Sequence, residues 1–506
     1  MGDLSGRLST APRLIGAAWS LVRADALAPR EIAPLLPAWA RIVADLLRLA
    51  AGPESRRGRP GERLAHVLER EGPVAIKLGQ FLSTRADIFG ADFAEDLARL
   101  KDRLPPFPTP VASAEVERAL GRPLSSIFAS FEDSVGAASL AQVHSAVLLD
   151  GRRVAVKVLR PGVEAKVAAD IEALTQAAGF IESVAPAARR LEPRAFAATV
   201  ARALRLELDL RFEAAGADEL REAMSLDAYM TAPKVIWDGV ARRVLTLEWA
   251  DGDALSDPSV LDRPDLDRPR LATDLVRAFL AQAMDHGVFH ADLHEGNLFV
   301  DAQGRMVAVD FGIVGRLGPG ERRYLAEILW GFLNRDYARV AAVHFEAGYV
   351  PAHHDRAAFA QALRAVGEPI FGRSAADVSM GRLLTLLFEI TALFDMRLRP
   401  ELVLLQKTMV TVEGVARRLD PGFDIWAAAE PVVRRWISRE LSPASRLRDL
   451  GVQAREALGR LAAGPPLPRA ADPEPSATSA PNLSGLGFML GVLTASFAFV
   501  AGWLLR

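Results

Sequence analysis

The chain has 506 residues, more than one compact core usually contains, and its length indicates two or three folded units. Hydrophobic residues make up 50% of it and charged residues 25%, a globular composition with a tendency towards membranes. A net charge of -2 argues against a nucleic-acid-binding protein, which needs a basic surface. The absence of cysteine excludes disulfides and cysteine-ligated zinc.

Residues 1–110 are predicted to form an N-terminal helical extension that ends in the proline-rich stretch "RLPPFPTP" (103–110). Near the start, the apolar run "LIGAAWSLV" after Arg13 could imitate a signal peptide. The run has only nine residues, is broken by Arg23 and Asp25, and carries its apolar side chains at helical spacing. The pattern therefore favours an amphipathic helix over a secretion signal.

Residues 111–250 change to a strand pattern and are predicted to form the smaller lobe of a two-lobed fold. The runs "AQVHSAVLL" and "RRVAVKVLRPG" are joined by Asp150 and Gly151, a typical hairpin turn. Lys157 then lies on a strand, in the context of the protein-kinase lysine that holds nucleotide phosphates. Lysine occurs only six times in this arginine-rich chain, so each retained lysine is a candidate for a specific role. An ordinary exposed strand lysine is the alternative.

A kinase lysine pairs with a glutamate on a helix. The predicted helix "ARALRLELDLRFEAAG" offers Glu207 as first choice and Asp209 beside it, although two acids on a charged helix are ordinarily a solvated face. Further along, "LTLEWADG" is the predicted hinge, where the backbone from Glu248 to Ala250 would contact adenine.

Residues 251–425 are predicted to be mostly helical and to form the larger lobe, interrupted by "GVFHADLHEGNLFVDAQGRMVAVDFG" (287–312). Asp292 and Asn297 are five residues apart, and Asp310 lies 13 beyond Asn297. Kinase-type phosphoryl transfer needs a carboxylate that faces the acceptor, plus an asparagine and an aspartate that hold magnesium. The kinase signature has the same Asp-to-Asn interval followed by Asp-Phe-Gly. We therefore predict Asp292 as the catalytic carboxylate and Asn297 and Asp310 as Mg²⁺ ligands.

Two other interpretations of this segment stay open. His290, Asp292 and His294 alternate along the chain and would suit a transition metal, or they would form a hydrogen-bonded loop. Asp310 would then be an ordinary turn aspartate. Neither interpretation explains the downstream "VDFG".

Three features separate the chain from protein kinases. The phosphate-covering loop, normally glycine-rich so that backbone can approach the phosphates, contains Gly136, Ala137, Ala138 and Ser139. Ala291 stands where an arginine normally reads a phosphorylated activation loop, and no Ala-Pro-Glu follows the "DFG". The residues that hold a protein substrate are therefore missing.

The C-terminal part is predicted to contain a basic helical segment and linker (426–482) and a transmembrane helix (483–505). "LSGLGFMLGVLTASFAFVAGWLL" carries no charge and exceeds the roughly 20 residues that cross a bilayer. A buried C-terminal helix is the alternative. Arginines upstream predict, by the positive-inside rule, a cytoplasmic body anchored in the inner membrane of a bacterium. Gly487, Gly491 and Ala495 are spaced four apart, which is compatible with a homodimer.

With these departures from protein kinases, the chain resembles the UbiB family of atypical kinase-like proteins, which is associated with ubiquinone and other isoprenoid-quinone metabolism. The resemblance covers about residues 60–425. "EGPVAIKLGQFLSTRADIF" is similar to the family's Lys-x-Gly-Gln element, and "VGAASLAQVH" to its alanine-rich loop. "LELD" resembles its Glu-x-Asp element, "FHADLHEGN" its catalytic loop, and "LLQKTMVTVEGVARRLDP" a segment of its larger lobe.

The resemblance implies that the Lys-x-Gly-Gln helix covers the nucleotide site where a peptide would otherwise bind. Lys77 and Gln80 would close the site, and Lys77 would be held by Glu207 and Asp209. The family looks like ATPases or small-molecule kinases rather than protein kinases. Two residues depart from its pattern: Gly136 stands where an alanine is usual, and Glu295 replaces a proline and adds negative charge near the metal.

The sequence therefore predicts an α+β, two-lobed protein-kinase-like fold with an N-terminal helical extension and a C-terminal transmembrane helix. The expected cofactors are ATP and Mg²⁺, and the expected activity is that of an ATPase. Expected partners are an anionic membrane lipid, a prenylated quinone precursor and a biosynthetic enzyme complex, with no nucleic acid. A lipid or small-molecule kinase and a nucleotide-binding pseudokinase scaffold are the alternatives.

Overall fold

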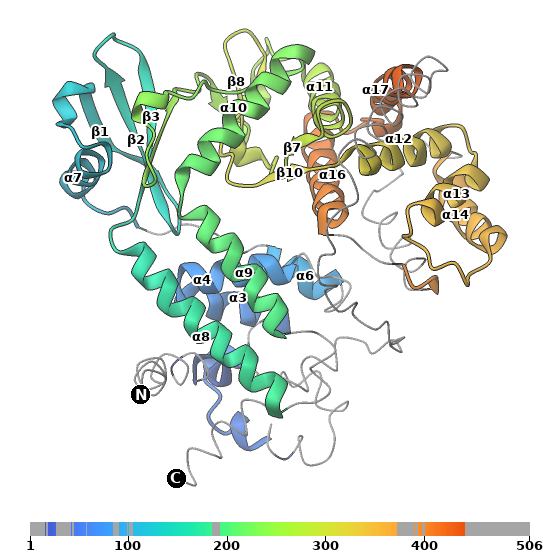
Figure 1. The fold of residues 1–506 in the computed structure, drawn as a ribbon, viewed down its shortest axis with the longest axis horizontal. Coiled ribbons are helices and arrows are strands. Elements are labelled where there is room, and N and C mark those ends of the chain that lie inside the picture. Colours follow the sequence, from blue (N-terminus) through green and yellow to red (C-terminus); the bar gives the residue numbers. More distant parts are fainter. Residues whose placement is uncertain are drawn as a thin grey trace, which may run out of the picture. The chain divides into compact units, whose positions relative to one another are not determined.

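The protein is represented by a computed structural model (Figure 1). It describes residues 16, 19–26, 42, 45–56, 58–83, 91–98, 100, 105–184, 193–371, 390, 393–396 and 400–440. The described chain divides into two compact units. The first contains the described residues up to Ala215 together with Lys234–Trp249, and the second contains Gly216–Pro233 and the described residues from Ala250 onwards.

The first unit is built on a four-stranded antiparallel sheet of order β1-β2-β3-β5. Its strands are β1 (Phe128–Ala137), β2 (Ala141–Leu148), β3 (Arg153–Leu159) and β5 (Val244–Glu248). The predicted hairpin at Gly151 is confirmed, because this residue has φ 86° and its N–H donates to the carbonyl of Leu148.

One face of this sheet carries the core of the first unit. Val154, Val156 and Val158 of β3 are fully buried and pack with Val116 of α7 (Thr109–Leu120). Because successive side chains of a strand point to opposite faces, Lys157 lies on the other face. The alternation of β3 therefore directs the lysine away from the core.

Helices make up the rest of the first unit (Figure 1). The long α8 (Val163–Val184) packs beside α9 (Pro193–Glu207). After a two-residue break α10 (Leu210–Asp227) begins, of which the residues up to Ala215 belong to this unit and the rest to the second. Helices α3 (Pro60–Glu71), α4 (Pro73–Ser83) and α6 (Ala91–Ala98) pack on one another around Leu68, Leu97 and Leu100. The predicted helical extension is thus present over its described part.

The second unit holds two small sheets, of order β4-β9-β8-β6 and β10-β7. Their strands are β4 (Met230–Thr231), β6 (Asp253–Ala254), β7 (Val288–His290), β8 (Leu298–Val300), β9 (Met306–Ala308) and β10 (Val314–Arg316). The parallel pairing of β4 with β9 brings a strand from the predicted smaller lobe into this unit, which the sequence pattern did not indicate.

Helices make up most of the second unit (Figure 1). They are α11 (Arg268–Ala281), α12 (Pro319–Leu333), α13 (Tyr337–Glu346), α14 (Arg356–Phe371), α16 (Pro400–Leu419) and α17 (Ile425–Glu440). Of these helices, α11 and α16 contact the small sheets. Helix α11 continues into a π-helical turn (Gln282–His286) that ends at Gly287, whose φ of 71° confirms the predicted C-cap. Antiparallel sheet and helices occur together in the first unit, and helices predominate in the second, which agrees with the expected α+β class.

Helix α17 is the described part of the predicted basic segment. It buries Val432, Val433 and Trp436, and it packs against α11 and α12. Arg435 and Arg439 form ion pairs with Asp285 at 2.6 and 2.7 Å. These two arginines of the predicted basic segment are therefore engaged by an acid of the same unit.

Within the described residues, no helix combines the length and the apolar composition that a membrane span requires. The predicted span at 483–505 and the linker before it lie outside the described residues.

The buried His344 of α13 gives the second unit a pH-dependent stability. Burial lowers its pKa from 6.5 to about 4, and its Nδ1 is bonded to the carbonyl of Val340 at 2.8 Å. The neutral form is favoured in the folded state, so the contribution is present above pH 6.5 and is lost as the pH falls towards 4. At pH 4 the loss amounts to about 3 kcal/mol of unfolding free energy from this residue.

We expect His344→Phe to flatten the dependence of stability on pH between 7 and 4, because it removes the titrating group. Equilibrium urea unfolding at a series of pH values measures this dependence. The control is His66→Gln, which changes an exposed histidine of α3. An unchanged pH slope in His344→Phe would contradict the assignment.

Candidate functional site

A buried imidazole organises the segment that carries the predicted acids. His290 ends β7 and is completely buried. Its Nδ1 accepts from the N–H of Asp292 at 3.1 Å, and its Nε2 is 3.1 Å from the carbonyl of Val309, which can only accept. The ring is therefore neutral with the proton on Nε2. Burial lowers the pKa of His290 and favours this form.

These bonds decide between the interpretations of the alternating histidines. Both ring nitrogens of His290 are occupied by backbone groups, so the residue has no nitrogen for a metal. His294 lies half exposed, with its Nε2 3.6 Å from Asp292 Oδ2. The transition-metal interpretation of His290, Asp292 and His294 is therefore wrong, and the hydrogen-bonded loop is what the structure contains.

Asp292, Asn297 and Asp310 are placed by backbone hydrogen bonds. The side-chain Nδ2 of the buried Asn297 donates to the carbonyl of Asp292 at 3.0 Å, which directs Oδ1 the other way. The N–H of Val309 donates to the carbonyl of Asn297 at 2.9 Å, so Asp310 follows directly beside the loop. Asp310 has φ 61°, a left-handed conformation that aspartate tolerates better than most residues.

The donor set of these residues suits a hard cation. An amide oxygen from Asn297 and a carboxylate from Asp310 are oxygen ligands of the type that Mg²⁺ prefers. The carboxylate of Asp292 is about one-third exposed, which leaves it accessible to a reacting group. The residue types are those that the predicted roles require, and the division into two metal ligands and one catalytic carboxylate stays a prediction.

Helix α16 contacts the loop of the predicted acids through two of its side chains. Thr408 Oγ1 donates to the carbonyl of Ala291 at 3.0 Å, and Ala291 is only 1% exposed. Arg418 forms an ion pair with Glu295. The position at which protein kinases carry an arginine is thus buried under a helix, and the extra negative charge that we expected from Glu295 is balanced by Arg418.

In the first unit, Lys157 Nζ donates to Glu213 Oε1 at 2.7 Å. Both side chains are mostly buried, with exposed fractions of 21% and 10%. This corrects the predicted pairing of Lys157 with Glu207 or Asp209. The break between α9 and α10 puts Glu207 and Glu213 on different helices, whereas the sequence suggested one continuous helix.

Glu207 instead lies 3.2 Å from Lys77, which confirms the ion pair that the family resemblance implied. The carboxylate of Asp209 binds Arg211 at 2.6 Å, and this hydrogen bond lowers the pKa of Asp209. Its Oδ1 also accepts from the N–H of Arg211, in the first turn of α10. An aspartate directly before a helix start is a typical N-cap, and it is the sequence signal that could have located the break, and with it Glu213.

The Lys-x-Gly-Gln element lies on α4. A side-chain carbon at Gly79 would overlap the buried Leu100 and Leu68, so the glycine permits α4 to pack closely on its neighbours. Gln80 lies on the same helix, and its carbonyl accepts from Ser83 Oγ at 2.7 Å. The glycine therefore has a packing role, while a closing role for Gln80 stays a prediction.

The alanine-rich loop joins β1 to β2, and several of its backbone groups form hydrogen bonds within the protein. The carbonyl of Ala138 accepts from Arg160 Nε at 3.0 Å, and its N–H donates to the carbonyl of Ala141 at 2.8 Å. Ala137 pairs with Gln142 in the sheet, and Ser139 is completely buried. Gly136 has open space where a side-chain carbon would lie and a φ outside the left-handed region, so the structure does not require glycine there.

A buried polar network fixes the strand after this loop, which sequence reasoning missed. Gln142 exchanges hydrogen bonds of 2.8 and 3.1 Å with the backbone of Phe107, and its Nε2 is 2.7 Å from His144 Nε2. His144 Nδ1 is 2.8 Å from the carbonyl of Glu132, and burial lowers the pKa of this histidine. The polar residues of "AQVH" are the signal, because a buried strand seldom carries two polar side chains without partners.

The predicted hinge offers only some of its backbone groups. The N–H of Glu248 donates to the carbonyl of Lys234, and that of Trp249 donates to the carbonyl of Arg153. The Arg153 guanidinium also lies 3.9 Å from the Trp249 ring centre. If adenine binds at this predicted hinge, the carbonyl oxygens and the N–H of Ala250 are the groups that would contact it.

Comparison with known proteins agrees with these observations. Residues 99–344 match the ABC1 atypical kinase-like domain, and residues 363–424, which include α16, match the UbiB helical domain. The chain is 40% identical over 395 residues to a protein of Marinobacter nauticus named "Probable protein kinase UbiB", with 77% of this chain and 72% of the relative covered. A protein of the same name from Xanthomonas euvesicatoria pv. vesicatoria is 40% identical over 443 residues, with coverage of 85% and 79%.

A solved structure shares the fold. Rv3197 of Mycobacterium tuberculosis, determined in complex with erythromycin, matches with a TM-score of 0.50 at 23% identity, covering 78% of this chain and 98% of that chain. The fold and the arrangement of acids and lysines thus define an atypical kinase-like protein. The chain belongs to the UbiB family.

The tight packing at Gly79 gives a testable difference between two helical glycines. Alanine is favoured over glycine in a helix by up to about 1 kcal/mol, whereas overpacking a core costs about 1–3 kcal/mol. We expect Gly79→Ala to destabilise the protein, because the new methyl group overlaps Leu68 and Leu100. In α16, Gly414 has open space at the same place, so Gly414→Ala should stabilise. Thermal unfolding of the two variants beside the parent checks this, and a Gly79→Ala protein as stable as Gly414→Ala would refute the packing role.

Proposed function

We propose that this protein is a membrane-anchored, Mg-ATP-dependent ATPase that supports isoprenoid-quinone biosynthesis. The observation that carries the proposal is the complete set of phosphoryl-transfer residues. In the second unit, hydrogen bonds link Asn297 to the backbone of Asp292 and to Val309, the residue before Asp310. In the first unit, Lys157 is bonded to Glu213. A scaffold that binds nucleotide without chemistry has no need of the whole set.

Each residue has a distinct part in the proposed reaction. Asn297 and Asp310 would hold Mg²⁺, which neutralises phosphate charge when bound. Lys157 steadies the phosphates while Glu213 fixes the position of its ammonium group, and Asp292 orients the attacking water. Lys77, held by Glu207, and Gln80 would keep the site closed, as the family resemblance implies.

Protein substrates are disfavoured by the environment of Ala291. In protein kinases an arginine at this position reads a phosphorylated activation loop, but here the residue is buried and its carbonyl is bound by Thr408. The chain also lacks an Ala-Pro-Glu sequence after "DFG". Both observations support hydrolysis or transfer to a small molecule over transfer to a protein.

The lipid part of the proposal depends on the family association and on the uncharged stretch 483–505. We propose that the ATP cycle extracts or presents a prenylated precursor at the cytoplasmic face of a bacterial inner membrane. An apolar cavity lined by residues of α11, α12, α16 and α17, such as Phe279 and Trp426, has a volume of about 20 Å³. This volume holds roughly one water molecule, so the cavity cannot hold a prenyl chain. The proposed lipid would therefore bind at another place on the protein.

The decisive test follows the γ-phosphate of labelled ATP with the full-length protein in anionic liposomes that contain a prenylated phenol. We expect Mg²⁺-dependent release of free phosphate, stimulated by the liposomes or the phenol. Asp310→Asn should abolish it, because the variant removes a metal carboxylate. Asp265→Asn is the control, since this exposed aspartate of the second unit pairs with Arg263 and not with a residue of the proposed site.

Other outcomes of this experiment have definite meanings. Turnover by Asp310→Asn equal to that of the parent would refute the metal assignment. Label on a lipid or other small molecule would show that the protein is a small-molecule kinase. Gly136, which departs from the family's alanine, would then be the first residue to vary. Binding of nucleotide without any turnover would support the scaffold alternative.

The corrected lysine pair gives a separate prediction. We expect Glu213→Gln to lower kcat/KM for ATP at least about tenfold, because a charge-assisted hydrogen bond to Lys157 contributes about 1.5–3 kcal/mol. Asp209→Asn changes a neighbouring acid that binds Arg211, and it should alter kcat/KM less than about threefold. The same phosphate-release assay measures both variants, and a larger loss in Asp209→Asn than in Glu213→Gln would reverse the assignment.

A further inference from the structure

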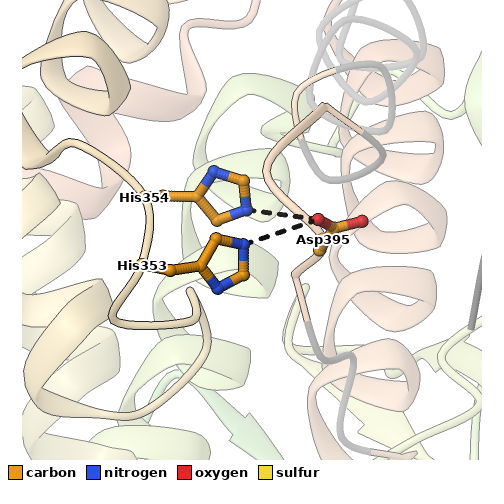
Figure 2. Close-up of side chains that lie close together, drawn as sticks. All are labelled: His353, His354 and Asp395. Atoms are coloured by element: carbon orange, nitrogen blue, oxygen red, sulfur yellow. Dashed lines mark hydrogen bonds and ion pairs between the residues drawn. The ribbon is translucent and has the colours of Figure 1, made fainter. Parts of the chain in front are cut away.

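Two adjacent histidines lie in the turn between α13 and α14, far along the chain from the phosphoryl-transfer residues. His354 Nε2 lies 3.2 Å from Asp395 Oδ2, and His353 Nε2 lies 4.0 Å from the same oxygen. Figure 2 shows both rings turned towards this one carboxylate. The two rings also lie against each other, with centres 4.1 Å apart.

One potential ligand atom from each of these three residues lies within 4.8 Å of the other two. A tetrahedral zinc ion with bonds of about 2.0–2.1 Å holds its ligand atoms about 3.3 Å apart. The pair formed by His354 and Asp395 is already at this spacing, and the pair formed by His353 and Asp395 is wider by less than 1 Å. His353 is 68% exposed, so its ring can move inwards without disturbing packed neighbours.

The hydrophobic core of the second unit holds the two turns in position. Phe394, next to the aspartate, packs on His354 with ring centres 5.4 Å apart and on Phe359 of α14 at 4.9 Å. Val350 and Tyr337 belong to the same cluster. Asp395 itself has φ 48°, a conformation that positions its carboxylate in a tight turn. The ligands are therefore presented by packed backbone, although they lie 41 residues apart in the chain.

We propose that His353, His354 and Asp395 form a binding site for a divalent transition cation, with Zn²⁺ as the preferred ion. Two imidazole nitrogens and one carboxylate oxygen are the ligand types of known three-residue zinc sites, in which water takes the fourth position. Imidazole favours zinc over the magnesium that the oxygen-ligand site prefers. On binding, the proton on His354 Nε2 is displaced to Nδ1 or to solvent, and the carboxylate exchanges a hydrogen bond for a metal bond.

The site has a structural consequence that is independent of the proposed ATPase activity. A cation bound by all three residues ties the turn at His353 and His354 to the turn at Asp395. Because binding occurs only in the folded state, the cation stabilises this part of the second unit by mass action. Among the described residues, His353, His354 and Asp395 form the group of histidine and acidic side chains whose ligand atoms lie close enough together to hold a metal ion.

The test titrates the metal-free full-length protein with Co²⁺ and with Zn²⁺ at pH 7.5, in excess Mg²⁺ to occupy the oxygen-ligand site. Co²⁺ should give visible absorption bands of a tetrahedral or five-coordinate complex at one equivalent, and Zn²⁺ should displace it. His353→Ala and Asp395→Asn should each weaken Zn²⁺ binding at least about tenfold, because each removes one of three ligands. Both residues are exposed, so these variants are expected to fold like the parent.

A matched control is His66→Ala. His66 is 73% exposed and lies 3.4 Å from Glu69, so it resembles the site in having a histidine beside a carboxylate but lacks the second histidine. Its Zn²⁺ affinity should equal that of the parent. Absence of a one-equivalent Co²⁺ spectrum, or equal Zn²⁺ affinity in the parent and in both His353→Ala and Asp395→Asn, would overturn the proposal.

Discussion

The neutral imidazole of His290 is the interaction on which the second unit's acids depend. It accepts from the N–H of Asp292 and donates to the carbonyl of Val309, so one buried ring joins the loop of the proposed catalytic carboxylate to the strand end before Asp310. Protonation would place a second donor against the Asp292 N–H and remove one of these bonds. Complete burial prevents this by favouring the uncharged ring, and the acids keep their spacing.

Helix α16 imposes the second constraint, because it fixes the surroundings of the loop that carries Ala291 and Glu295. Its Thr408 binds the carbonyl of Ala291, and its Arg418 neutralises Glu295. A large cationic side chain at residue 291 would have to displace this helix. The loss of the arginine is thus coupled to the presence of the UbiB helical domain, since the same surface cannot both receive α16 and read a phosphorylated segment.

The first unit contains two separate lysine–glutamate ion pairs, whereas the sequence suggested the same acids, Glu207 and Asp209, as partners of both lysines. Lys157 binds Glu213 and Lys77 binds Glu207, and the short break at residues 208–209 separates the two acids onto different helices. Both lysines could be recognised because lysine is rare in this chain and each lies in a recognisable motif. Of their partners, Glu207 of Lys77 was expected from the family resemblance, whereas Glu213 of Lys157 was missed because one continuous helix was expected through residues 208–209.

The sequence by itself determined the class of site and most of the elements that carry it. Local patterns sufficed for the hairpin at Gly151, the C-cap at Gly287, the strand of Lys157 and the spacing of Asp292, Asn297 and Asp310. Only the tertiary structure decided which acid meets which lysine, how α16 covers Ala291, and that His353 and His354 face Asp395. The physical reason is distance along the chain: turns and alternation depend on adjacent residues, whereas these contacts join residues separated by 41 to 130 positions and arise only when helices pack.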